Sequence, residues 1–123
     1  MAFNPVIQWV QAIAAINERD WATLESLVAD DFHQVLVVGD LSGPPTYEFD
    51  KAAVIANGRA VAKRGWHMHA KSLVGLGDTV VATVEETFDD GSSQAAYAVV
   101  RFNDQGQAVQ MYANVPVLAT AVS

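Results

Sequence analysis

The sequence contains no cysteine, and this absence excludes several kinds of protein. Disulfide-stapled folds, cysteine-ligated zinc sites, iron–sulfur clusters and thiol catalysis all require that residue. No apolar run approaches the ~18 residues that a membrane span needs. The first residues, Met1 to Pro5, lack the basic and apolar segments of a secretory signal. We therefore expect a cytoplasmic protein.

Positive charge is also scarce. Seven Lys and Arg residues stand against 14 Asp and Glu residues, which gives a formal net charge of −7. The cations are scattered along the chain, whereas a groove that follows a nucleic-acid backbone needs clustered ones. We expect no nucleic-acid partner and no binding to an anionic membrane surface.

Motifs that hold a nucleotide or a metal are absent from the chain. It has no glycine-rich phosphate loop, no dinucleotide fingerprint and no Ser-His-Asp spacing. His67 and His69 alternate along a predicted strand and so share one side of it, but no third ligand stands at a diagnostic spacing. We therefore predict neither a cofactor nor a metal.

The chain does contain enough apolar material for one folded domain. It has 123 residues, of which 51% are hydrophobic and 17% are charged. A domain of this size buries roughly 65% of its unfolded surface, so it needs no metal or disulfide to fold. We predict a single domain over residues 1–123, with a core over about residues 5–116.

The first half of the chain has helical periodicity. Asn4-Pro5 is typical of a helix start, and apolar residues then recur at i, i+3 and i+4 spacing up to Ile16. Asp20 and Asp50 are candidate caps of two further helices. The predicted elements are helices ending at residues 17–19, near 30–31 and near 64, and a strand over 32–38.

The second half indicates an antiparallel meander. Its predicted strands cover residues 66–74, 79–88, 93–102 and 107–118, with a hairpin signal at Asp90-Gly91. This order predicts an α+β fold in which a curved, mixed and mostly antiparallel sheet and three helices enclose a cone-shaped pocket. Both faces of the last two strands are apolar, so both should be covered, one by the pocket and one by a second copy of the chain.

Four segments carry a family resemblance: Ala15–Asp20, Leu27–Asp31, Phe49–Val54 and Val99–Asn103. They resemble the nuclear transport factor 2-like superfamily, which includes ketosteroid isomerase, SnoaL-type polyketide cyclases, scytalone dehydratase and limonene epoxide hydrolase. The resemblance covers about residues 5–116 and implies the cystatin-like cone fold. It implies no particular reaction, because members of this fold catalyse unrelated reactions or none.

The resemblance also allows a test for ketosteroid isomerase chemistry. That enzyme uses an Asp base on its first strand, and a helix Tyr and a neutral Asp that hold the enolate. An ungapped placement sets the Tyr at Ala12, the base at Leu36 and the neutral Asp at Ala98, none of which transfers a proton. The resemblance therefore implies a different residue set, although a gap would move Asp40 toward the position of the base.

The other enzyme signatures of the superfamily are not visible either. The Asp–Arg–Asp relay of limonene epoxide hydrolase would need an acid where Asn103 follows Arg101. The paired tyrosines of scytalone dehydratase are not evident beside His67 and His69. The polyketide cyclases carry an Asp on the last strand, where this chain has Tyr112-Ala113-Asn114.

Strand alternation makes Glu85 a candidate catalytic residue. A two-residue turn at Asp90-Gly91 would pair Thr83 with Ala98. If Ala98 faces the pocket, as the family placement implies, Thr83 and Glu85 face it too, and a carboxyl there would suit a general acid or base. Alternatively, Glu85 reaches water at the strand end, or a register shift of one residue sends Glu86 inward instead.

Other side chains could assist this carboxyl or bind a ligand. His69 is a candidate proton shuttle, with a half-buried structural histidine as the alternative. Asp40 is a candidate base or orienting acid, with an Asp that bonds its own turn as the alternative. The candidate ligand-binding residues, whose side chains are mostly flat, apolar or small, are Trp9, Asn57, Thr83, Ala98, Phe102, Met111 and Tyr112.

Two functions from different classes fit these patterns. One is a cofactor-independent acid–base enzyme of isomerase, dehydratase, cyclase or hydrolase type that acts on a small apolar molecule. The other is a non-catalytic small-ligand-binding or dimerisation domain of the same fold. We expect a homodimer in either case, because an outer sheet face with Val84, Phe88, Tyr97 and Val99 would otherwise be an exposed apolar patch.

Overall fold

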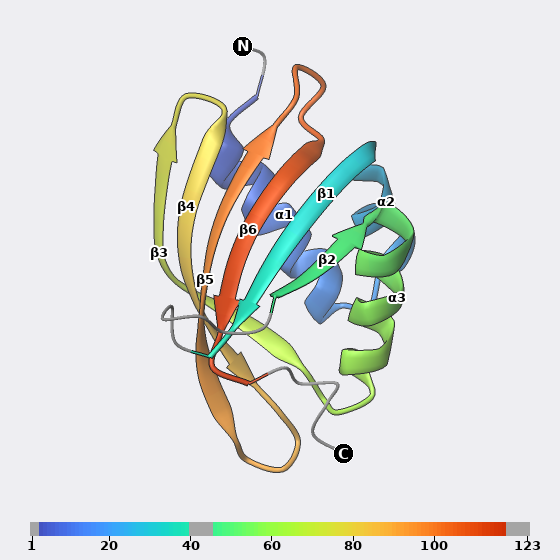
Figure 1. Cartoon of the computed structure of the whole chain (residues 1–123), viewed down its shortest axis with the longest axis vertical. Coiled ribbons are helices and arrows are strands. Elements are labelled where there is room, and N and C mark those ends of the chain that lie inside the picture. Colours follow the sequence, from blue (N-terminus) through green and yellow to red (C-terminus); the bar gives the residue numbers. More distant parts are fainter. Residues whose placement is uncertain (1–2, 40–45, 118–123) are drawn as a thin grey trace.

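A computed structural model describes residues 3–39 and 46–117 (Figure 1). These residues form three helices and six strands, which confirms the predicted α+β class with its curved mixed sheet. None of the described helices has the length and apolar character needed to cross a membrane. The elements are α1 Pro5–Asn17, α2 Trp21–Ser26, β1 Val28–Val38, β2 Thr46–Asp50, α3 Lys51–Ala62, β3 His67–Leu76, β4 Thr79–Thr87, β5 Ser93–Phe102 and β6 Ala108–Val115.

Each helix begins at a short polar side chain that accepts a backbone hydrogen bond. Asn4 accepts from the amide of Val6, and Asp50 accepts from that of Ala53 at 2.8 Å. Asp20 does the same for α2. Such caps satisfy amide groups that the first helical turn leaves unpaired, and for this reason the helix starts could be read from the sequence.

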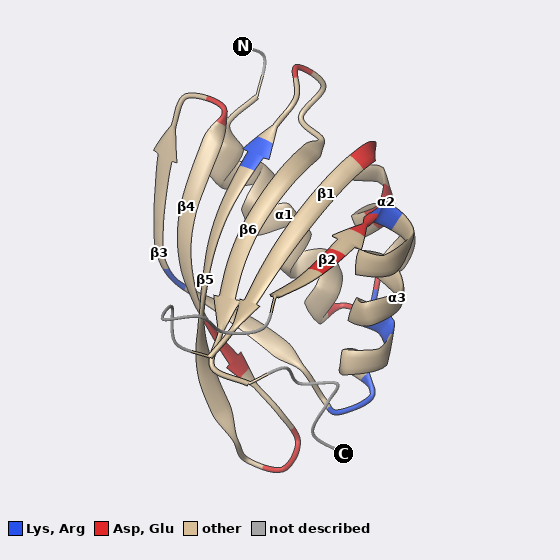
Figure 2. Ribbon diagram, in the orientation of Figure 1, with Lys and Arg blue, Asp and Glu red and all other residues tan. Residues whose placement is uncertain are grey.

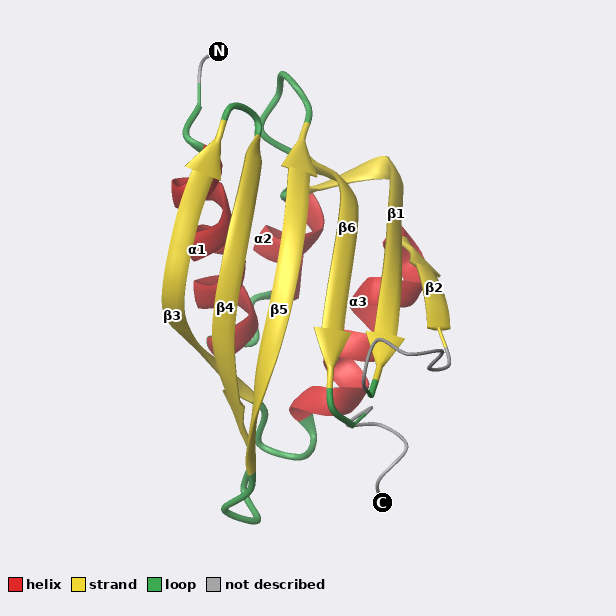
Figure 3. Cartoon of the chain, turned by 60° about the vertical axis from the view of Figure 1, so that its left-hand side comes forward, coloured by secondary structure: helices red, strands yellow, loops and turns green. Residues whose placement is uncertain are grey.

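The six strands form one sheet in the order β2-β1-β6-β5-β4-β3. The central pair, β1 and β6, is parallel, and every other neighbouring pair is antiparallel. All three helices lie on the same face of the sheet (Figure 3). On that face α1 packs against β3 and β4, and α3 packs against β1. The enclosed space between helices and sheet is therefore built from both halves of the chain.

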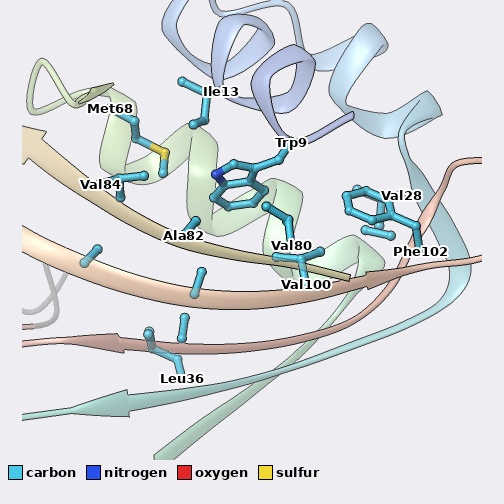
Figure 4. Packing of buried hydrophobic residues seen from close by; sticks show 14 of the residues in the cluster. Trp9, Ile13, Val28, Leu36, Met68, Val80, Ala82, Val84, Val100 and Phe102 are labelled. Carbon is cyan, nitrogen blue, oxygen red and sulfur yellow. The ribbon is translucent and has the colours of Figure 1, made fainter. Parts of the chain in front are cut away.

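Alternation along the strands separates an inner face from an outer face. On β4 the inner residues Val80, Ala82 and Val84 are buried, and the outer residue Val81 is exposed. Trp9 projects from α1 onto Val80 and Ala82 and joins the helical layer to this inner face (Figure 4).

The hairpin between β4 and β5 differs from the prediction by one residue. Its loop is Asp89-Asp90-Gly91 rather than Asp90-Gly91, because the amide of Phe88 bonds the carbonyl of Ser92 and the amide of Gly91 bonds the carbonyl of Phe88. Gly91 has φ 84°, as expected for the left-handed third residue of a three-residue hairpin loop. Every partner along the hairpin is shifted in consequence.

Two further elements differ from the prediction. The second helix does not continue to Asp30-Asp31, because β1 already begins at Val28 and pairs there with Ala108. The strand β2, which pairs with β1, was not predicted. The predicted loop residues 40–45, which include Asp40, lie outside the described residues.

The predicted composition of the outer sheet face is partly wrong. Val84 is buried on the inner face, and Phe88 lies in the hairpin, where the guanidinium of Arg64 stands 5.0 Å from the centre of its ring. Tyr97 and Val99 are exposed on the outer face as expected. The Lys and Arg residues are spread over several elements, with one group at the end of α3 that includes Arg59, Lys63 and Arg64 (Figure 2).

Candidate functional site

The helices and the inner sheet face enclose a cavity of about 170 Å³. A row of alanines on three neighbouring strands forms the alanine floor, in which Ala82 pairs with Ala98 and Ala98 pairs with Ala113. Ala98 and Ala113 line the cavity, and Ala82 lies beside them in the same row. Small side chains at these three positions leave the space that larger residues would fill. The volume is close to that of an engineered cavity of roughly 150 Å³ that binds benzene.

The wall of the cavity is mainly apolar and holds a few polar groups. Residues from all three helices and from all strands except β2 contribute to it. No Lys, Arg or His is among the described residues that line it. Besides the indole groups of Trp9 and Trp66 and the phenol of Tyr97, its polar side chains are those of Gln34, Asn57, Glu86 and Gln94.

Glu86 carries the only carboxyl among the described lining residues. It lies on the inner face of β4 and is 8% exposed. Trp66 donates its indole N–H to Oε2 at 2.9 Å, and Gln94 donates its amide N–H to Oε1 at 2.8 Å. The two donors hold the carboxylate in one orientation at the cavity wall.

Burial raises the pKa of the Glu86 carboxyl above its ordinary value. The apolar surroundings disfavour the charged form and so raise the pKa. The hydrogen bonds from Gln94 and Trp66 lower the pKa, but they offset only part of the effect of burial. A carboxyl with a raised pKa exchanges protons closer to neutral pH, which suits a general acid or base.

The two donors to Glu86 are themselves held in place. The side chain of Gln94 makes two hydrogen bonds with the backbone of Val117. It donates to the carbonyl at 3.1 Å and accepts from the amide at 3.3 Å. Gly58 lies beside Trp66, and a Cβ atom at Gly58 would stand 3.9 Å from that ring and 3.2 Å from Trp21. The absence of a side chain at Gly58 therefore lets α3 approach both aromatic rings.

Asn17 fixes the edge strand beside Glu86. Its side chain accepts from the amide of Met68 at 2.8 Å and donates to the carbonyl of Met68 at 2.9 Å. Met68 pairs with Glu86 across β3 and β4, and its side chain is buried on the cavity wall. The end of α1 is thereby joined to the strand that flanks the carboxylate.

Two polar groups on the wall have no hydrogen-bond partner among the described residues. The indole N–H of Trp9 is fully buried and unpaired. The side chain of Gln34 is 7% exposed, and none of the described residues bonds its amide. Leaving a buried polar group unpaired costs about 1–3 kcal/mol, so such groups call for an explanation.

The predicted inward position of Glu85 is wrong. In the observed register Glu85 pairs with Ala95, and its side chain lies on the outer face with 41% of its surface exposed. Lys71 stands 3.7 Å from its carboxylate. The longer hairpin loop is the reason, because a shift of one residue exchanges the two faces of a strand. The weighed alternative, Glu86 inward, is the observed arrangement.

The other two catalytic candidates are not part of the cavity wall as described. His69 is exposed on the outer face opposite Glu85, and its Nε2 lies 3.2 Å from the hydroxyl of Thr87. As a candidate proton shuttle, His69 would have to reach the cavity, and it is not among the described residues that line it. Asp40 lies outside the described residues.

The ligand-binding candidates divide between the two faces of the sheet. Thr83 was predicted on the pocket side, but it pairs with the outward-facing Tyr97, so that prediction is wrong. The sequence left open which of Met111 and Tyr112 the last strand turns toward the pocket; Met111 lines the cavity, and Tyr112 is 52% exposed. The candidates that the structure places on the cavity wall are Trp9, Asn57, Ala98, Phe102 and Met111.

The sequence contained signals for the residues that were not chosen as candidates. Alternation through Phe32 and Leu36 places Gln34 on the same inner face of β1. Trp66 directly precedes β3, and its role depends on a contact with Glu86 twenty residues away, for which no local signal exists. No group of three or more metal-binding side chains occurs within residues 3–39 and 46–117.

Comparison with known proteins identifies the fold. No protein-family model and no curated protein sequence matches the chain. Among solved structures, it is similar to a candidate ketosteroid isomerase from Kribbella flavida, with a TM-score of 0.75 and 15% identity over 92% of this chain and 78% of that one. It is also similar to IdmH, a candidate polyketide cyclase from Streptomyces antibioticus, with a TM-score of 0.71 and 19% identity over 92% of both chains.

A third similar structure is a candidate isomerase of the SnoaL-like family from Agrobacterium tumefaciens. Its TM-score is 0.68, with 16% identity over 92% of this chain and 98% of that one. These likenesses show that the chain has the cystatin-like fold that the sequence resemblance implied.

Proposed function

We propose that this protein is a cofactor-independent acid–base enzyme that acts on a small, mostly apolar molecule. In this proposal Glu86 takes a proton from the bound molecule or gives one to it. The observation that carries it is the placement of one oriented, buried carboxyl on the wall of an otherwise apolar cavity. Burying a carboxyl costs folding free energy. Its presence on the cavity wall therefore points to a requirement other than stability.

The environment of Glu86 supports proton transfer in either direction. Because the pKa of the carboxyl is raised, it lies closer to neutral pH than that of an ordinary glutamate. Both the protonated and the ionised form are then closer to being populated at the pH of the reaction. Trp66 and Gln94 bond the charged form, so the ionised state also has partners.

The names of the similar structures agree with this class of reaction at the level of the fold. They include a candidate ketosteroid isomerase, a candidate polyketide cyclase and a candidate SnoaL-like isomerase. The polar residues of this cavity differ, however, from those that ketosteroid isomerase uses. Ala12, Leu36 and Ala98 line the cavity at the positions where the family placement sets the three isomerase residues, and none of them can exchange a proton.

Hydrogen exchange at carbon tests the proposal. Wild-type protein should accelerate the exchange of α-hydrogens in D₂O, followed by NMR, for at least one of a series of apolar ketones of increasing length. Glu86→Gln should lower this acceleration by about 10²-fold or more, the usual contribution of a general base. Glu85→Gln is the matched control and should stay within about twofold, because that carboxylate lies on the other face. Equal rates for wild type and Glu86→Gln would contradict the assignment.

A second function has one observation in its favour. Both oxygens of Glu86 already accept a hydrogen bond, which is also how a structural carboxylate is satisfied. A domain that binds a small molecule without converting it would have the same cavity. It would show saturable binding of the ketones with no acceleration of exchange.

We further propose that two copies associate through the outer sheet face. Tyr97, Val99 and Tyr112 are exposed on adjacent strands, and Val81 extends this patch onto β4. A two-fold axis would place the same patch of both copies in contact. Light scattering at micromolar concentration should report a dimer. Val99→Glu should give a monomer and Ile7→Glu, an exposed position on α1, should not; a wild-type monomer would refute the proposal.

A further inference from the structure

The polar groups of the cavity fall into two sets that differ in how they are satisfied. At Glu86 both carboxylate oxygens are bonded, by Trp66 and by Gln94. At Gln34 the side-chain amide is buried on the cavity wall, and no described residue bonds it. An amide has two N–H donors and a carbonyl acceptor, so Gln34 leaves several hydrogen bonds to be made by a bound molecule.

The sheet register places Gln34 away from the carboxylate. Gln34 pairs with Met111, Met111 with Val100, and Val100 with Val80, so these four residues form one row across the inner face. Glu86 is six residues beyond Val80 on β4, which corresponds to about 20 Å of strand. The alanine floor of Ala82, Ala98 and Ala113 lies between the two levels.

The charge of the wall restricts what can bind there. The described residues that line the cavity include no Lys, Arg or His, and their one carboxyl is that of Glu86. A carboxylate or phosphate would enter this apolar space without a cation to pair with, which is strongly unfavourable. A neutral oxygen, in contrast, needs only hydrogen bonds, and the Gln34 amide provides them.

We infer that Gln34 is a ligand-anchoring residue, and that the cavity takes an uncharged, mostly apolar molecule whose carbonyl or hydroxyl oxygen hydrogen-bonds the Gln34 amide. The apolar body of the molecule lies over the alanine floor, on the side toward Glu86. This inference rests on the proposed function only in that the cavity is a ligand site. It adds the substrate class and a residue that sets specificity.

Two probes of nearly the same shape test this anchor. Cyclohexanone and methylenecyclohexane differ in one group, because an oxygen that accepts a hydrogen bond replaces a CH₂ that does not. Gln34→Leu should weaken the binding of cyclohexanone by about fivefold or more and leave that of methylenecyclohexane unchanged or tighter. Comparing the variant with the wild type for each probe cancels the different costs of taking the two probes out of water.

A matched control and a charged probe complete the design. Gln110→Leu makes the same substitution on β6, where Gln110 bonds the Tyr112 hydroxyl on the outer face, and should alter neither affinity. Cyclohexanecarboxylate at neutral pH should bind at least tenfold more weakly than cyclohexanone. Equal or tighter binding of the carboxylate would overturn the inference of an uncharged ligand.

The wild-type protein offers a readout that does not depend on the fold of a variant. The side-chain amide signals of Gln34 in a ¹H–¹⁵N spectrum should move on addition of cyclohexanone and stay in place with methylenecyclohexane. Stationary Gln34 signals at saturation, equal effects of Gln34→Leu on both probes, or no binding of either probe at millimolar concentration would each overturn the assignment. A ketone as short as cyclohexanone that is held at Gln34 does not reach Glu86 across about 20 Å of strand, so its binding and the exchange test are separate. If Gln34 anchors the ketone and no ketone of the exchange series exchanges, the anchor stands and the proposed catalysis by Glu86 fails.

Discussion

Two adjacent carboxylates on β4 experience opposite environments. Glu85 faces outward, with Lys71 at 3.7 Å and much of its surface in water, whereas Glu86 faces the cavity and is bonded by Trp66 and Gln94. Their chemical groups are identical, so the difference comes from the side of the sheet on which each one lies. The length of the loop between β4 and β5 therefore decides which of the two carboxylates faces the cavity. A loop shorter by one residue would turn Glu85 inward instead.

The same contrast extends along both faces of the sheet. The inner face of β5 has buried Ala96, Ala98 and Val100, and the outer face between them has exposed Ala95, Tyr97 and Val99. Neighbours in sequence therefore supply matched pairs, in which the same substitution is made once inside and once outside. Differences within a pair report the environment rather than the chemistry of the substitution.

The largest effect on stability is expected for valine truncation. Val100→Ala should lower the free energy of unfolding by about 2–3 kcal/mol, because it removes buried methyl groups from a position that is almost fully enclosed. Val99→Ala, on the outer face of the same strand, should cost less than about 1 kcal/mol. Urea denaturation of the two variants at equal protein concentration checks this, and similar losses would contradict the assigned faces.

A smaller effect is expected when the cavity floor is filled. Ala98→Leu places a larger side chain between Ala82 and Ala113 and should weaken cyclohexanone binding by about tenfold or more, since the ligand loses its space. Ala95→Leu on the outer face is the control and should leave binding unchanged. Calorimetric titration of both variants makes the comparison, and tight binding to Ala98→Leu would place the ligand elsewhere.

The smallest expected effect is the pH dependence of stability due to Glu86. Its pKa in the folded state is raised by burial, so the stabilising contribution of the protonated group is complete below the unfolded pKa and is lost as the pH rises through the folded pKa. Glu86→Gln has no proton to lose and should become more stable relative to wild type as the pH is raised from about 4 to about 7.

Urea denaturation across this pH range measures the difference, and Glu85→Gln is again the matched control, with an expected change in stability within about 0.5 kcal/mol. If Glu86→Gln lost stability relative to wild type on going from acid to neutral pH, the raised pKa would be wrong.

Local chemistry made much of this fold predictable. Asn4, Asp20 and Asp50 cap their helices through contacts within three residues, so the sequence alone indicates where the helices begin. The bounds of β5 were also predictable, because Gly91 stands just before the strand and alternation continues to Phe102.

Features that depend on distant partners were not predictable in the same way. Asp90-Gly91 is compatible with hairpin loops of two or three residues, and the choice between them depends on how the whole hairpin packs. The bond from Trp66 to Glu86 exists only after α3 has packed on the sheet. The short edge strand β2 depends on its pairing with β1, for which its own sequence gives little indication.

The most direct test of the account is a pH titration of the Glu86 carboxyl by ¹³C NMR, with the indole N–H signal of Trp66 followed in the same samples. The account predicts a midpoint above that of an ordinary glutamate, and a shift of the Trp66 signal with the same midpoint, because the two groups share a hydrogen bond. A carboxyl that titrates at or below the ordinary value, with no response at Trp66, would contradict it.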